Sequence, residues 1–149
     1  MTMTLMNPSV IAVLLDAPFA TASAMPQSTD LAVAAGTSLT YDLEGTLLVR
    51  SADFTAAGVV VGVAWPEGCV DGVAEIVTGA GRTEGNVGDD FAAPAVMLPD
   101  AGSWPVTVRA TFTTDVYAEG SFAVTLASSD GVTEVSAGAG SWLRVWALG

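Results

Sequence analysis

Residues 104–112, WPVTVRATF, show the clearest structural pattern in this chain. Every second residue from Trp104 to Phe112 is apolar, and the residues between them are mostly polar. A period of two is typical of a β-strand that buries one face and exposes the other. The stretch therefore predicts a half-buried strand, and the surrounding sequence indicates how many strands accompany it.

Further strand patterns lie on both sides of this stretch. Alternation recurs at 121–126, after a polar segment at 113–120 that predicts a loop, and again at 39–43 and 46–50. The segment 58–65, GVVVGVAW, is apolar on both faces and small on one, which predicts a strand packed closely on both sides. These segments are separated by glycine, proline and aspartate clusters, which are typical of turns.

The number and spacing of these segments predict the fold class. With shorter runs at 73–78 and 95–98, we expect about eight or nine strands, and no long segment after residue 30 has a helical period. Many short strands without helical crossovers favour an all-β protein, an antiparallel β-sandwich or jelly roll. We divide the chain into an N-terminal arm or edge strands, 1–36, and a sandwich domain, 37–149.

The first 36 residues differ in kind from the rest, because they hold four of the five methionines and apolar pieces too short to form a layer. Ser9 could cap a helix over 9–17, but the β-branched residues there favour an extended form. One interpretation is that 1–36 supplies edge strands of the same sandwich. The other is an extended arm that docks on a neighbouring subunit or scaffold by strand addition. The predicted docking residues are Val10, Ile11, Val13, Leu14 and Leu15.

The charge balance excludes several partners. The chain has 16 acidic residues against four basic ones, all arginine, and its formal net charge is −12. Because it has no lysine to help neutralise phosphates, we expect no nucleic-acid partner. An anionic membrane surface is disfavoured for the same reason, so we expect no membrane partner either.

The same composition removes most catalytic chemistry. The chain has no histidine, so mechanisms that use it as a base or ligand are excluded. Its one cysteine, Cys69, cannot form an intramolecular disulfide and has no histidine or lysine to activate it. Sixteen carboxylates supply many candidates for glycoside hydrolysis, but nothing in the sequence selects a pair. We therefore expect no enzyme activity and no cofactor.

A metal site has one weak candidate, the segment GRTEGNVGDDF at 81–91. Its oxygen donors suit a hard cation such as calcium, but their spacing matches no specific calcium loop. The favoured interpretation is a solvated, flexible acidic loop without metal. The candidate calcium ligands are Glu84, Asn86, Asp89 and Asp90.

The final segment, SWLRVWALG at 141–149, is apolar on both faces if it forms a strand. A sandwich strand needs only one buried face, so the second face predicts a contact with another subunit. An arginine between two tryptophans can stack on them and still bind a carboxylate. The alternative is a central strand whose arginine is neutralised by an acid of its own chain. The predicted oligomer interface consists of Trp142, Arg144, Trp146 and Leu148.

Residues 100–149 combine a strand opened by GSW, a GSFAVTL strand and an apolar final strand. This pattern resembles the jelly rolls of trimeric C1q-like and tumour-necrosis-factor-like domains, which recur in bacteriophage head fibres and capsid decoration proteins. The acidic, lysine-free composition also resembles small virion proteins of phages that infect high-GC actinobacteria. The resemblance implies a non-enzymatic virion structural protein, most simply a capsid decoration protein. It would bind the major capsid protein or other virion proteins as a homo-oligomer, with a trimer favoured, on the capsid surface rather than the tail.

A second function remains open at this point. Sandwich domains with exposed tryptophan and tyrosine often bind carbohydrate, so the chain could be a tail-borne or secreted module that recognises surface glycan. The four tryptophans, however, lie on predicted strands among apolar neighbours, which favours a core or interface role. They are Trp65, Trp104, Trp142 and Trp146.

Overall fold

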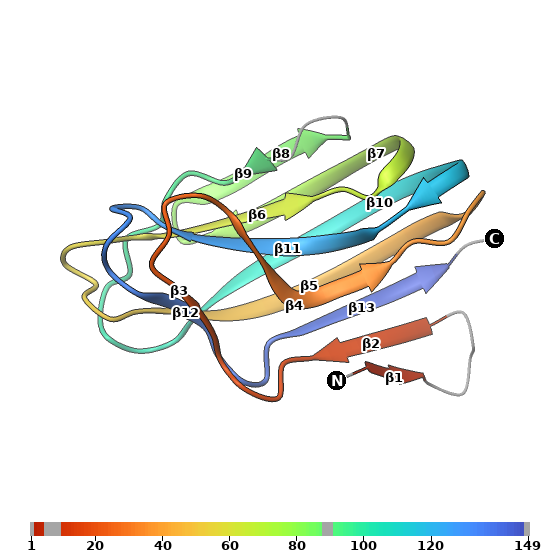
Figure 1. Ribbon diagram of the computed structural model, residues 1–149. Coiled ribbons are helices and arrows are strands. Elements are labelled where there is room, and N and C mark those ends of the chain that lie inside the picture. Colours follow the sequence, from red (N-terminus) through yellow and green to blue (C-terminus); the bar gives the residue numbers. More distant parts are fainter. Residues whose placement is uncertain (1, 5–9, 88–90, 148–149) are drawn as a thin grey trace.

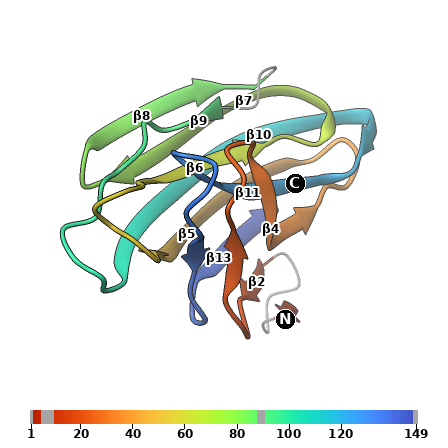
Figure 2. The same cartoon turned by 60° about the vertical axis from the view of Figure 1, so that its left-hand side comes forward.

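The computed structural model describes residues 2–4, 10–87 and 91–147, which form two antiparallel sheets packed face to face (Figures 1 and 2). One sheet has nine strands and contains the path β1-β2-β13-β5-β10-β7-β8, with β3 and β12 paired beside it. The other has the order β4-β11-β6-β9. The strands are β1 (Thr2–Thr4), β2 (Val10–Leu14), β3 (Phe19–Thr21), β4 (Gln27–Ala34), β5 (Thr40–Ser51), β6 (Val59–Ala64), β7 (Glu67–Thr78), β8 (Gly81–Asn86), β9 (Phe91–Ala92), β10 (Trp104–Glu119), β11 (Ser121–Ser128), β12 (Val135–Ala137) and β13 (Trp142–Ala147).

Four antiparallel pairs are nested inside one another along the chain. Strand β2 pairs with β13, β4 with β11, β5 with β10, and β6 with β9. The first and third pairs lie in the nine-stranded sheet, and the second and fourth lie in the other, so the chain alternates between the sheets. This arrangement is that of a jelly roll, and the predicted all-β sandwich is confirmed.

The strand count exceeds the expected eight or nine, partly because a hairpin is added to this framework. Strands β7 and β8 pair with each other and extend the nine-stranded sheet beyond β10. The prediction of a flexible loop at 81–91 was therefore wrong for 81–86. Gly85 faces the ring of Phe91, and a Cβ there would approach that ring to 2.3 Å. This glycine serves close packing rather than flexibility.

The core between the sheets follows the alternation in β10. Val106, Val108, Ala110 and Phe112 are buried, as the period of two predicted. Phe112 stacks on Tyr41 and on Phe122, with ring centroids 5.0 and 5.6 Å apart. The indole of Trp65 meets the rings of Phe112 and Phe122 edge-on. These four aromatic side chains join the two sheets near the end of the sandwich where β5 and β11 begin.

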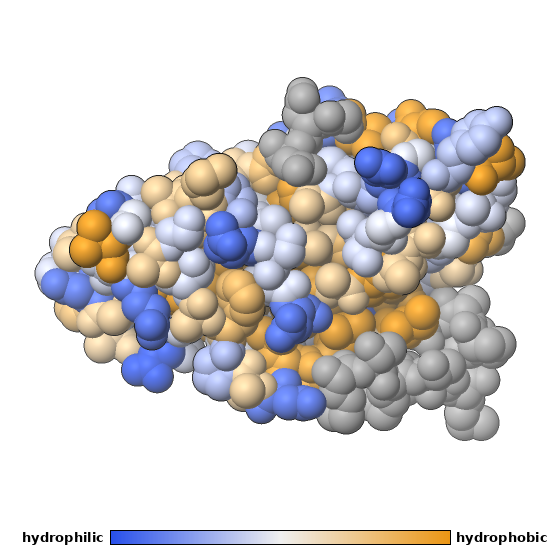
Figure 3. Space-filling view, viewed as in Figure 1, coloured by the Kyte–Doolittle hydropathy of each residue, from blue (hydrophilic) through white to orange (hydrophobic). Residues whose placement is uncertain are grey.

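The N-terminal segment belongs to the same sandwich. Strand β2 is extended, as expected, and pairs with β13, while β3 pairs with β12 and β4 with β11. Val13 and Leu15 are buried in the core of their own chain, so the prediction that these side chains dock on a scaffold is corrected. Ile11 packs against that core, and Leu14 is partly exposed. The side chain of Val10 lies outside the described residues. In Figure 3, orange apolar side chains gather in the lower half of the view, where these strands lie.

Candidate functional site

Strand β13 presents different chemistry on its two faces. It lies inside the nine-stranded sheet, between β2 and β5. Leu143 and Val145 point into the core and are almost fully buried. Trp142, Arg144 and Trp146 alternate with them and therefore lie on the outer face of the sheet. The predicted interface residue Leu148 lies outside the described residues.

Arg144 is held between the two tryptophans. Its Cζ lies 5.3 Å from the ring centroid of Trp142 and 5.7 Å from that of Trp146. These distances are within the range of cation–π attraction. Its Nη1 also lies 3.9 Å from Oε1 of Glu44 on β5. The expected stacking is thus present, and the acid that neutralises the arginine comes from its own chain.

A row of charged residues crosses the outer face of the sheet, and we call it the charged row. Cross-strand pairing places Arg144 opposite Glu44, Glu44 opposite Arg109, Arg109 opposite Glu75, and Glu75 opposite Glu84. The row therefore spans β13, β5, β10, β7 and β8. Opposite charges on directly paired residues stabilise a sheet, and like charges destabilise it.

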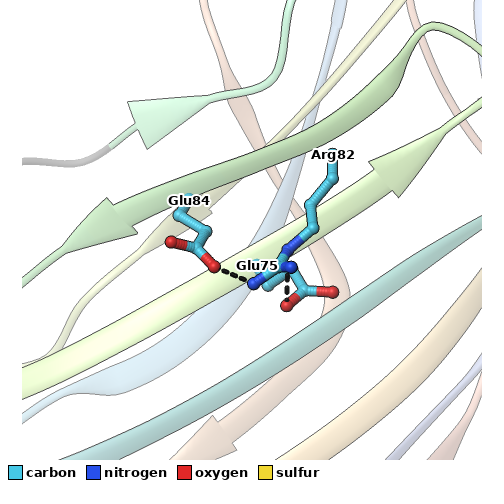
Figure 4. A network of polar contacts seen from close by, with 3 residues as sticks. All are labelled: Glu75, Arg82 and Glu84. Atoms are coloured by element: carbon cyan, nitrogen blue, oxygen red, sulfur yellow. Dashed lines mark hydrogen bonds and ion pairs between the residues drawn. The ribbon is translucent and has the colours of Figure 1, made fainter.

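The two glutamates at the end of this row, Glu75 and Glu84, are neutralised by one arginine on β8. Arg82, on β8, places Nε 3.0 Å from Oε2 of Glu75, and its Nη2 contacts Oε1 of Glu84 (Figure 4). Near the middle of the row, Nε of Arg109 lies 4.0 Å from Oε2 of Glu44. Three of the four arginines of the chain thus form ion pairs on this sheet face.

This face differs in charge from the rest of the protein. Strand alternation puts four arginines and five carboxylates on this face, so it is almost neutral; they are Arg50, Arg82, Arg109 and Arg144, and Asp42, Glu44, Asp71, Glu75 and Glu84. The chain as a whole carries −12. Most of the negative charge therefore lies elsewhere on the surface.

The face is hollowed into a shallow groove of about 380 Å³. Trp146 lies on one side of it, and the charged row crosses it. Exposed aliphatic side chains accompany these groups on the same sheet: Leu14, Val73 and Val77 are 36, 45 and 38% exposed. The polar residues that line the groove are Asp42, Glu44, Glu75, Glu84, Arg109 and Thr111. The face thus combines aromatic, aliphatic and paired charged groups.

Cys69, the one candidate nucleophile named from the sequence, has an unreactive thiol. Burial raises the pKa of the Cys69 thiol to about 11, and its Sγ lies 3.8 Å from the main-chain oxygen of Asp71. A thiol with this pKa is protonated at neutral pH and is a poor nucleophile. Across the described ranges, no cluster of three or more potential metal ligands occurs. No helix suited to crossing a membrane is found in those ranges either.

Of the four calcium candidates, the structure describes Glu84 and Asn86. The carboxylate of Glu84 is engaged by Arg82 in the charged row. Asn86 ends β8 and is exposed. Asp89 and Asp90 lie outside the described residues. Glu84 and Asn86 thus share the outer side of one strand, and a cation at Glu84 would have to displace an ion pair.

One acidic residue outside this face has a perturbed pKa. Hydrogen bonds from the hydroxyl and main-chain N–H of Thr133, and from the N–H of Val132 and the hydroxyl of Ser128, lower the pKa of Asp130. These donors lie within three residues of Asp130. The carboxylate therefore fixes the turn between β11 and β12.

The tryptophans lie in three environments. Trp65 belongs to the aromatic core, Trp142 and Trp146 to the outer face, and Trp104 to one end of the sandwich, where its Nε1 donates to Oδ1 of Asp100 at 3.1 Å. Sequence reasoning found the Trp–Arg–Trp group. It missed the charged row, because the row depends on strand register, for which the sequence carries no local signal.

Comparison of the chain with protein-family models, curated proteins and solved structures gives no match.

Proposed function

We propose that this protein is a non-enzymatic structural protein of a virion, a capsid decoration protein that binds the shell as a homo-oligomer. The observation that carries the proposal is the outer face of β13, where Arg144 lies between Trp142 and Trp146 on an almost neutral surface. Two copies of a strongly acidic chain repel one another over most orientations. An almost neutral face with two indoles is where two copies meet at the lowest electrostatic cost.

Docking on the shell does not require the buried side chains of β2. Strand β1 lies at the edge of the nine-stranded sheet and pairs only with β2 among the described strands. Strand addition at such an edge uses main-chain hydrogen bonds. Weak docking of each copy is strengthened when several linked copies bind together, which favours a trimer or another closed oligomer on the capsid surface.

The test is the mass of the purified protein in solution. Light scattering after size exclusion should give a closed oligomer at micromolar concentration, and Trp146→Ser combined with Arg144→Glu should give a monomer. Val132→Ser is the matched control, because Val132 is 80% exposed and lies in the β11–β12 turn, away from the charged row. A monomeric wild-type protein, or an unchanged oligomer in the double variant, would contradict the proposal.

A second function is favoured by the groove itself. The indole of Trp146 borders a groove lined by carboxylates and by Arg109. Indoles stack on the apolar faces of sugar rings, and the charged groups can hydrogen-bond to hydroxyls. Under this alternative, the protein is a tail-borne or secreted glycan-binding module. Saturable binding to a glycan array that is lost in Trp146→Ala would support it over self-association.

A further inference from the structure

The outer face of the nine-stranded sheet arranges its side chains in three parallel rows. Strand pairing fixes which residues of β13, β5, β10 and β7 share a row. The charged row is the middle one, and each row beside it begins with a tryptophan on β13 and ends with a valine on β7. In that strand order, one flanking row is Trp142, Thr46, Thr107 and Val77, and the other is Trp146, Asp42, Thr111 and Val73.

The sign of the charge alternates along the charged row. From β13 to β7 the order is Arg144, Glu44, Arg109 and Glu75. When this row is read backwards, every positive charge takes the place of a negative one. A two-fold interface requires a surface that is complementary to itself, and the alternating row meets this requirement.

The arginines of this row have hydrogen-bond donors to spare. Arg144 and Arg109 approach Glu44 only to 3.9 and 4.0 Å, which is too far for a hydrogen bond. Within the described residues, the arginine side chains that donate hydrogen bonds are those of Arg50 and Arg82. The side chains of Arg109 and Arg144 are also 66 and 45% exposed. A carboxylate of another molecule can therefore accept hydrogen bonds from both.

One placement of a second copy uses the alternation fully. The second copy is turned by 180° about an axis that runs parallel to the strands and passes between β5 and β10, so that the two sheet faces meet. Arg144 then lies opposite Glu75 of the second copy, and Glu44 lies opposite Arg109 of the second copy. Because each contact occurs twice, four contacts between opposite charges form.

The flanking rows fit the same placement. Each indole of one copy meets an exposed valine of the other, so apolar area is buried on both sides. Val73 lines the groove, so Trp146 of one copy lies over the groove of the other. The opposed pairs are Trp142 with Val77, Trp146 with Val73, Thr46 with Thr107, and Asp42 with Thr111.

Other two-fold placements are less favourable. An axis along the charged row sets Arg144 against itself and Glu44 against itself. An axis parallel to the strands but lying on β5 or β10 also opposes identical charges. An axis between β10 and β7 sets Glu44 against Glu84, and one between β13 and β5 pairs only Arg144 with Glu44. Opposed like charges in an interface are strongly unfavourable, so the axis between β5 and β10 is selected.

The remaining charges of the face are compatible with this axis. Arg82 and Glu84, on β8, lie opposite uncharged residues of β2. Asp42 lies opposite a threonine. Arg50 and Asp71 lie beyond the three rows. No like charges therefore meet across the three rows or at the β2 and β8 edges that flank them.

The size and direction of the face also suit such a pair. Rotation about an axis parallel to the strands keeps the strand directions of the two sheets aligned, as in most face-to-face sheet packing. Six strands from β2 to β8, spaced ~4.8 Å apart, and the nine residues from Thr40 to Leu48, at ~3.3 Å each, outline about 850 Å². A stable interface of standard size buries about 800 Å² on each partner. The face is therefore large enough to hold two copies together.

We propose that two copies of this protein pair face to face through the outer faces of their nine-stranded sheets, about a two-fold axis between β5 and β10. This inference rests on the self-association proposed above and names its geometry. Arg144 contacts Glu75 of the second copy, and Glu44 contacts its Arg109. The symmetry closes the contact, so this face joins copies in pairs.

The test uses two variants of the full chain, each of which reverses one side of the contact between Arg144 and Glu75. In a pair of Glu75→Arg copies, arginine meets arginine at both contacts, and in a pair of Arg144→Glu copies, glutamate meets glutamate. In a mixed pair, both contacts again join opposite charges. The matched control is Asp30→Arg, which makes the same change of charge at an exposed position of β4 in the four-stranded sheet.

Sedimentation velocity at micromolar concentration gives the decisive result. We expect the wild type and Asp30→Arg to be dimers and each reversed variant alone to be a monomer. An equimolar mixture of the two reversed variants should show a twofold higher average mass than either alone. Circular dichroism and thermal melting verify that each variant folds. Should Glu75→Arg not fold, Glu75→Gln should raise the dissociation constant of the dimer at least fivefold, and Asp30→Asn should leave it unchanged.

Two outcomes would overturn the face-to-face pairing. One is a mixture of the folded reversed variants that stays monomeric, and the other is a Glu75→Arg or Glu75→Gln protein that pairs as tightly as the wild type. The proposed β13 interface would survive either result if the wild type is oligomeric and Trp146→Ser with Arg144→Glu separates it. A monomeric wild type would refute both proposals, and saturable glycan binding by that monomer would assign the face to a sugar.

Discussion

Replacing Arg144 with methionine measures what the two tryptophans contribute to stability. Methionine keeps much of the aliphatic length of arginine but removes its charge. The guanidinium lies 5.3 and 5.7 Å from the two ring centroids, and each such contact at a partly exposed site contributes about 0.5–1 kcal/mol. The pair with Glu44, at 3.9 Å and partly exposed, adds at most about 1 kcal/mol. We therefore expect Arg144→Met to lower the free energy of unfolding by about 1–3 kcal/mol.

Arg109→Met is the matched control. Arg109 contacts the same carboxylate, Glu44, at 4.0 Å, and forms no cation–π contact within the described residues. The difference between the two variants therefore isolates the tryptophans and should be about 1–2 kcal/mol. At an m-value of about 2 kcal/mol/M, the urea midpoint of Arg144→Met should lie about 0.5–1 M below that of Arg109→Met.

The assay is urea unfolding followed by tryptophan fluorescence at one fixed protomer concentration, because association contributes to apparent stability. A double-mutant cycle with Trp146→Leu measures one half of the stack directly. Equal midpoints for Arg144→Met and Arg109→Met would show that the tryptophans do not stabilise the arginine, and the argument from cation–π contacts would then fail.

Three further predictions concern other parts of the molecule. Gly45→Ala should destabilise the fold by about 1–3 kcal/mol in thermal or urea unfolding, because its Cβ would approach the main-chain oxygen of Trp142 to 2.4 Å; an unchanged midpoint would show that β5 and β13 separate easily. Asp130 has a pKa below its usual value when folded, so its stabilisation is present above pH 4 and is lost as pH falls through the range below 3.8. Asp130→Asn should therefore lose less stability than the wild type between pH 5 and pH 2, and parallel pH profiles would argue against this role. Cys69, with a pKa of about 11, should react slowly with a disulfide reagent at pH 7.5 and progressively faster up to pH 10; a rate independent of pH would contradict the raised pKa.

The fold class was predictable because the strand pattern is local. In β10, bulky apolar residues alternate with polar ones, and the structure buries the apolar set. In strand β11, alternation does not predict which residues are buried. This strand also alternates, yet Ala123, Thr125 and Ala127 on its second face are buried as well, because small side chains are covered by the neighbouring strands. Burial of this kind depends on neighbours that are distant in sequence.

Other differences between the sequence predictions and the structure also arise from contacts between residues that are distant in sequence. The acidic, glycine-rich composition of 81–86 predicted a loop, but Gly85 accommodates a phenylalanine ring, and the segment pairs with β7. The segment 113–120 also predicted a loop, but it continues β10 through a bulge. The charged row requires five strands in register, so the position of Arg109 opposite both Glu44 and Glu75 could not be predicted from the sequence.

The nested pairing of the strands also has a consequence for the time course of folding. Strand β2 is synthesised about 130 residues before its partner β13, since the pairing joins Val13 to Leu143. The contacts that bury Val13 and Leu143 therefore require closure of a loop that contains almost the whole chain, which makes folding slow. Until β13 leaves the ribosome, β2 and the adjoining edge of β5 lack their hydrogen-bonding partner and are open to pairing with other chains. The topology therefore leaves strand edges exposed to other chains until the last strand has been made.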